Sequence, residues 1–139
     1  MTQEDKELLF KSLNEGLYFN VVVQNVRPGM EHIKGRLLTM SFYQPVSVYV
    51  LTDPASGEQE FSPAEDIKPY LRPMSSMTEE ERNEYLDVKM QECERVALAE
   101  VYRPEAISIV LDWLNAHNFD YRGLIPKGLA IEAPEGMYA

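Results

Sequence analysis

The chain has 139 residues, of which 45% are hydrophobic, and its 23 acidic against 13 basic side chains give a formal net charge of −10. This size and apolar content fit one ordinary domain, or a small one plus an appendage, and exclude a wholly disordered chain. The negative charge disfavours unspecific binding to nucleic-acid phosphates and to anionic membranes.

Helical spacing of apolar residues marks the first predicted element. Leu9 and Leu13 share one face of residues 2–14, among acidic and basic neighbours, which predicts a short amphipathic helix. Thr2 is a suitable N-cap, and Gly16 can take the left-handed conformation that ends such a helix.

β-Branched and aromatic residues bounded by turns then predict short strands. The candidate segments are residues 17–26, 33–41, 46–52, 59–62 and 67–71. In the third, Val48 and Val50 alternate with Tyr49, as in a half-buried strand. A sheet this short leaves open edges unless it curls. We therefore expect an antiparallel meander or a small open β-barrel of the SH3-like or Sm-like kind, closed by the last of these segments.

Two prolines make residues 69–76 a stiff connector, because they remove backbone donors and hold the preceding residues extended. Thr78 and Glu81 follow with the spacing of a capping box. We expect this box to start a helix that runs to about Tyr102. Its inner apolar stripe consists of Leu86, Met90, Cys93, Ala97 and Val101.

A second helix is predicted from Glu105 to about Ala116, after Pro104. The tail, residues 119–139, is too apolar for disorder and too broken for a helix, so we expect an ordered, irregular strap. The fold class is thus α+β. Residues 1–72 hold the helix and barrel and residues 73–139 the helices and strap, either as two domains or as one integrated domain.

Two stretches of the second half carry a resemblance. They are IKPYLRPMSSMTEEE at residues 67–81 and DWLNAHNFDYRGLI at residues 112–125, continuing to Pro134. They are similar to an uncharacterised family of small proteins carried by phages and mobile elements of gut bacteria. The resemblance implies an accessory protein that acts on a host or phage component, for example as a defence antagonist. The family has no known activity, so no catalytic residue is carried over.

His117 and Cys93 are the candidates for catalysis. His117 lies just past a predicted helix end, near Asp112 and Asp120, where a carboxylate can orient a general base for hydrolysis. A histidine at this position can also cap free carbonyl groups and interact favourably with the negative end of the helix dipole, and we favour this capping role. We interpret Cys93, on the apolar stripe, as buried packing and not as a nucleophile.

Acidic residues gather at the start of the long helix: Glu79, Glu80, Glu81, Glu84 and Asp87. Consecutive helical residues point about 100° apart, so the first three cannot converge on one cation. We interpret the run as a solvated helix start and expect no metal site. Glu80, Glu84 and Asp87 are candidates for contact with a basic partner.

Tyr121, Arg122 and Lys127 form the candidate ligand site, because they can bind an anion or stack on a nucleotide base. The alternative pairs Arg122 with Asp112 or Asp120. Residues 123–128 do not form a P-loop, since the lysine precedes the second glycine and no hydroxyl follows.

Aromatic residues of the predicted barrel form another candidate surface. Tyr18, Phe42, Tyr43 and Tyr49 can leave an exposed aromatic face of the kind that binds extended peptides. We assign Trp113 to the core.

These observations lead to a non-catalytic interaction protein that binds a protein partner through Tyr43 and Tyr49 or through the acidic helix. The first alternative is a protein that binds or sequesters a small nucleotide signal, and the second is a hydrolase using His117.

The single cysteine and two histidines exclude a disulfide framework and an ordinary zinc set. We expect a cytoplasmic protein without export signal, cofactor, direct nucleic-acid binding or membrane contact. Whether the protein forms a homo-oligomer is left open.

Overall fold

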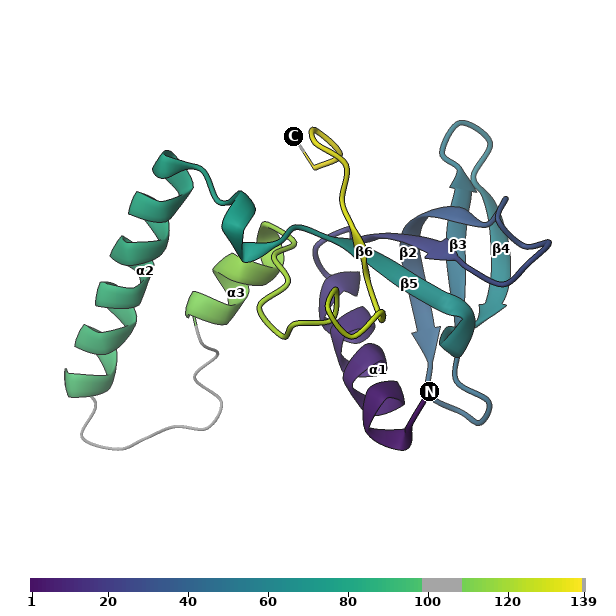
Figure 1. Cartoon of the computed structure of the whole chain (residues 1–139), viewed down its shortest axis with the longest axis horizontal. Coiled ribbons are helices and arrows are strands. Elements are labelled where there is room, and N and C mark those ends of the chain that lie inside the picture. Colours follow the sequence, from purple (N-terminus) through teal and green to yellow (C-terminus); the bar gives the residue numbers. More distant parts are fainter. Residues whose placement is uncertain (99–108, 139) are drawn as a thin grey trace.

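The computed structural model describes residues 1–98 and 109–138. In this part of the chain, helix α1 (Gln3–Leu17) precedes an open, mostly antiparallel sheet, so the fold is α+β. The strands are β1 (Val22–Asn25), β2 (Lys34–Ser41), β3 (Ser47–Asp53), β4 (Glu58–Pro63), β5 (Ile67–Leu71) and β6 (Ile131–Glu132). Helices α2 (Glu79–Leu98) and α3 (Ile109–Ala116) stand beside the sheet, while α1 packs against it (Figure 1).

The strand order is β4-β3-β2-β1-β5-β6. A short 3-10 helix, η1 (Ala64–Asp66), leads from β4 to β5, which pairs with β1 and not with β4. The other edge of β5 is taken by β6, which runs parallel to it with Tyr70 opposite Ile131. The sheet of the described residues is open, and β5 does not close it into a barrel. Strands β1 to β4 form the expected antiparallel meander with the predicted alternation in β3, although the first strand begins at Val22 and not at residue 17.

The core lies between α1 and the concave side of the sheet. Its buried side chains include Leu9 and Leu13 of α1, Val23 of β1, and Val48 and Val50 of β3. Leu124, Leu129 and Ala130 of the tail belong to the same cluster. Burial of each large aliphatic side chain contributes about 1.5–3 kcal/mol, so the tail stabilises the first half of the chain directly.

Helix α1 starts as expected, because the Thr2 hydroxyl accepts a hydrogen bond from the Asp5 amide at 3.1 Å. Its end differs from the expectation. Gly16 is buried inside the helix, where an added Cβ would lie 2.9 Å from a methyl group of Val21. The left-handed residue after the helix is Asn20, with φ of 57°. Gly16 thus serves close packing and not chain reversal.

Helix α2 does not bury the predicted stripe. Leu86 is 51% and Met90 64% exposed, and Cys93 is exposed as well. The reason is that α2 packs against α3, with Tyr85 and Trp113 in ring contact at 5.6 Å, and stands away from the sheet (Figure 1). The predicted helix end at Tyr102 and the start at Glu105 lie outside the described residues, as does Val101.

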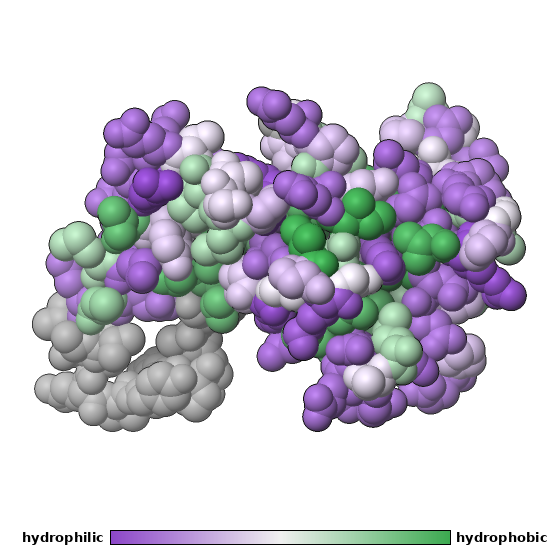
Figure 2. All heavy atoms as spheres, viewed as in Figure 1, coloured by the Kyte–Doolittle hydropathy of each residue, from purple (hydrophilic) through white to green (hydrophobic). Residues whose placement is uncertain are grey.

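The tail crosses the sheet near β5 and β6. There the Tyr138 hydroxyl accepts a hydrogen bond from the Val22 amide at 3.0 Å and donates one to the Tyr70 carbonyl at 2.6 Å. One hydroxyl thus joins two neighbouring strands, β1 and β5. Hydrophobic residues gather around this crossing and also lie over α2 and α3, among hydrophilic residues (Figure 2). Within the described residues, no helix combines the length and apolarity needed to cross a bilayer.

Candidate functional site

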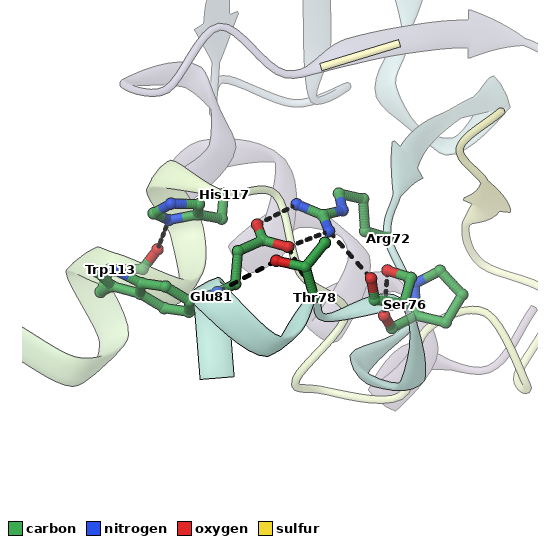
Figure 3. A network of polar contacts seen from close by, with 7 residues as sticks. Arg72, Ser76, Thr78, Glu81, Trp113 and His117 are labelled. Atoms are coloured by element: carbon green, nitrogen blue, oxygen red, sulfur yellow. Dashed lines mark hydrogen bonds and ion pairs between the residues drawn. The ribbon is translucent and has the colours of Figure 1, made fainter. Parts of the chain in front are cut away.

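Figure 3 shows a polar network where the connector after β5 meets the start of α2. The Arg72 guanidinium donates two hydrogen bonds to the Glu81 carboxylate, each of 2.7 Å, and a third to the Ser76 carbonyl at 3.2 Å. The capping box is confirmed: Glu81 accepts from the Thr78 amide at 3.0 Å, and the Thr78 hydroxyl accepts from the Glu81 amide at 3.1 Å. Glu81 therefore serves both the helix cap and the ion pair.

This ion pair changes the protonation equilibria of its members. Hydrogen bonds from Arg72, which outweigh partial burial, lower the pKa of Glu81 to about 2. The same hydrogen bonds raise the pKa of Arg72. Both groups are charged over the physiological range and satisfy each other, so this pair is a structural clamp and not a proton donor or acceptor.

His117 caps α3, as the sequence predicts. Its Nδ1 lies 2.8 Å from the Trp113 carbonyl oxygen, and its ring stacks on the Trp113 ring with 4.0 Å between centroids. Phe119 continues the stack, and the Arg72 guanidinium lies 4.3 Å above the Phe119 ring. Trp113 is part-buried in this stack and not in the main core.

The carboxylates named as partners of His117 lie elsewhere. Asp120 accepts hydrogen bonds from the amides of Leu124 and Ile125 at 2.8 and 2.9 Å. In the described part of the chain, no hydrogen bond or ion pair joins His117 to Asp112 or Asp120. The histidine and carboxylate required by the hydrolase alternative are therefore not brought together.

A groove of about 610 Å³ borders this network. One wall is the connector from Arg72 to Thr78, and the other is the tail from Glu132 to Tyr138, with Ala116 and His117 at the end of α3 between them. Among the described residues, no group of three or more histidine, cysteine or acidic side chains is placed to hold a metal ion.

Two of the three candidate ligand residues, Tyr121 and Arg122, lie close together, but both bind a carboxylate of α1. Arg122 forms an ion pair with Glu15, and the Tyr121 hydroxyl donates to the same carboxylate at 2.8 Å. Arg122 thus pairs with neither Asp112 nor Asp120. Lys127 is exposed and takes no part in this cluster.

The Glu15 cluster is electrostatically satisfied. Burial raises the pKa of Glu15, but hydrogen bonds from Arg122, Tyr121 and Asn115 outweigh burial and leave it below its ordinary value. Burial and the hydrogen bond to Glu15 raise the pKa of Tyr121 to about 12. With its charge already neutralised, Arg122 is a poor receptor for a phosphate.

Four large aromatic side chains on β3, β4 and the β2–β3 turn are exposed. Tyr43 is 88%, Phe42 53%, Tyr49 46% and Phe61 53% exposed. Tyr49 of β3 and Phe61 of β4 are directly opposite each other, with rings in edge contact at 5.7 Å, and Phe42 and Tyr43 follow in the β2–β3 turn. We call these four residues the aromatic face. Tyr18 lies apart from it in sequence, between α1 and β1.

Phe61 is the one member of the aromatic face that was not expected from the sequence. Its exposure could have been inferred from the alternation of the short strand β4, in which Ser62 lies on the buried side and Phe61 on the other side. The acidic candidates Glu80, Glu84 and Asp87 are exposed along α2.

Comparison of the chain with protein-family models, with curated proteins and with solved structures finds no match.

Proposed function

We propose that this chain is a non-catalytic interaction protein that binds a protein partner through the aromatic face. The observation that carries the proposal is the exposure of four large aromatic side chains on one pair of strands and the adjoining turn. Aromatic rings lose little side-chain entropy on binding and often supply most of the energy of an interface. Exposed apolar rings in contact with each other, as Tyr49 and Phe61 are, are typical of binding surfaces.

The sequence resemblance supports an origin in a phage or mobile element, with a host or phage protein as partner and the cytoplasm as location. A role as defence antagonist is part of this proposal. The strand order, with η1 leading from β4 to a β5 that pairs with β1, supports kinship with small SH3-like or Sm-like barrels opened at one seam.

Capture from host lysate tests the proposal when matched variants are compared. Tyr43→Ser with Tyr49→Ser removes half of the aromatic face, whereas Glu80→Gln with Glu84→Gln and Asp87→Asn neutralises the acidic face of α2. We expect the wild type and the α2 variant to retain one stoichiometric protein that the aromatic variant loses. Equal retention by all three proteins, or loss only in the α2 variant, contradicts the proposal.

The small-molecule alternative is supported only by the size of the groove beside Arg72, because Arg72 is paired with Glu81 just as Arg122 is paired with Glu15. The groove's volume of about 610 Å³ lies within the range of ligand pockets. Thermal-shift measurements against a panel of nucleotides test it, because a ligand at 100 times its Kd adds about 2.7 kcal/mol to stability. A panel without any shift excludes nucleotide binding at this groove.

A further inference from the structure

Strand β4 forms one end of the sheet. It pairs with β3, and no other described strand pairs with it. An edge strand presents unpaired amide and carbonyl groups to which another extended chain can bind. At the opposite end, β5 is covered by β6, so the two ends of the sheet differ.

The side chains of β4 alternate in chemistry between its two sides. Phe61 lies opposite Tyr49, and Gln59 opposite Leu51, on the convex side. Glu60 and Ser62 lie opposite Val50 and Val48, which are buried on the concave side, and Glu58 shares this side because strand side chains repeat every two residues. An aromatic ring therefore lines one side of the edge, and carboxylates line the other.

The charge around this edge is negative and only partly compensated. Residues 37–67 contain no lysine or arginine, and their acids are Asp53, Glu58, Glu60, Glu65 and Asp66. Lys6 pairs with Glu65 at 3.1 Å, and Arg27 lies 3.9 Å from Asp66. Glu58 and Glu60 have no ion-pair partner within residues 1–94 and 109–138. A second copy of the chain at this edge would add further carboxylates, and nucleic-acid phosphates would be repelled.

We propose that β4 accepts an extended segment of the partner in which lysine or arginine alternates with apolar residues. Added as a further strand, the segment places its apolar side chains beside Phe61 and its basic side chains beside Glu58 and Glu60, while its main chain bonds to the open edge. This inference rests on the proposed function, since it names the chemistry of the partner at the aromatic face.

Two synthetic peptides of about eight residues test the pattern. One alternates lysine and valine, and the other has the same composition with all lysines before all valines. Fluorescence anisotropy with the full chain should show the alternating peptide binding about tenfold more tightly, because only its side chains fit both sides of the edge. Equal affinities, or no binding of the alternating peptide, overturn the inference.

Matched variants locate the site. Glu58→Gln with Glu60→Gln should weaken binding of the alternating peptide about fivefold, and Phe61→Ser should weaken it by a similar factor. Glu80→Gln with Glu84→Gln removes the same charge from α2 and should leave the affinity unchanged. An equal loss in both charge variants would mean unspecific attraction and would also overturn the inference. Thermal unfolding of each variant confirms that it folds.

Hydrogen exchange gives a readout that does not depend on affinity. Strand addition should slow exchange of β4 amides when the alternating peptide is bound. Unchanged exchange in β4 with the peptide bound contradicts strand addition. If the peptides fail while lysate capture still depends on Tyr43 and Tyr49, this inference falls and the proposed function stands. If capture does not depend on those residues, the proposed function falls.

Discussion

The side-chain amide of Asn25 in β1 donates a hydrogen bond to the Ser62 hydroxyl in β4 at 3.0 Å, although β2 and β3 lie between these strands in the sheet order. This contact requires the sheet to curl until its distant strands meet across the concave side. Asn25 is 2% and Ser62 0% exposed. The curl turns the convex side of β3 and β4, which carries Tyr49 and Phe61, outward.

Removal of this buried pair should destabilise the protein. Asn25→Ala leaves the Ser62 hydroxyl and the Arg27 amide, which bonds to Asn25 Oδ1 at 2.9 Å, without their partner. We expect a loss of about 2–4 kcal/mol in the free energy of unfolding, and about 1–2 kcal/mol for Ser62→Ala. Urea denaturation measures both. Losses below 0.5 kcal/mol would mean that the contact does not hold the curl.

The Arg72–Glu81 pair predicts a pH-dependent stability. Because the pKa of Glu81 is lowered from 4.5 to about 2, its contribution is complete above pH 4.5 and is lost as the pH falls towards 2. Both side chains keep some contact with water, at 22% and 15% exposure, so screening reduces the effect to about 1–2 kcal/mol.

Denaturation of Glu81→Gln at several pH values checks this prediction. The variant should be less stable than the wild type at neutral pH, and the difference should vanish in acid. Glu80→Gln is the matched control, since Glu80 is exposed and outside the network. A difference that stays constant down to pH 2 would attribute the loss to the helix cap alone.

The Glu15 cluster predicts a spectroscopic change in Tyr121. Glu15→Gln removes the carboxylate that helps to raise the pKa of this tyrosine to about 12, so its ionisation should move towards the ordinary value. Ultraviolet titration of the variant against the wild type measures this shift. The lost ion pair with Arg122 should cost about 1–3 kcal/mol of stability. An unchanged titration curve would contradict the contact between α1 and the tail.

Gly35 predicts a steric limit in β2. A Cβ added there would collide with the carbonyl oxygen of Leu51 in β3. Gly29 has positive φ as well, but nothing lies within 4 Å of its added Cβ. We expect Gly29→Ala to cost about 1–2 kcal/mol from backbone strain alone, and Gly35→Ala at least about 2 kcal/mol more. Equal losses in thermal unfolding would contradict the close approach of the strands.

Features that depend on near neighbours were predictable from the sequence. The Thr78–Glu81 capping box and the Thr2 cap involve residues three positions apart, and the alternation in β3 follows from strand geometry alone. His117 at the end of α3 belongs to the same class, because its partner Trp113 lies one helical turn before it.

Features that depend on distant parts of the chain were not predictable. Arg122 finds its partner 107 residues away in Glu15, and no local pattern favours that carboxylate over Asp112 or Asp120. Helical periodicity placed Cys93 on an apolar stripe, but periodicity does not say whether another element covers the stripe. The barrel remained open because the short strand β6, near the end of the chain, occupies the edge of β5.

The hydroxyl of Tyr138 between β1 and β5 has a consequence for synthesis of the protein. A nascent chain still lacking residues 131–138 has neither β6 nor the bridge from Val22 to Tyr70. Until the ribosome has added these residues, the edge of β5 that β6 later covers stays open, and chaperones or neighbouring polypeptides can bind to it. The sheet therefore reaches its final form only after residues 131–138 have been made, and β4 is then its one long open edge in the described structure.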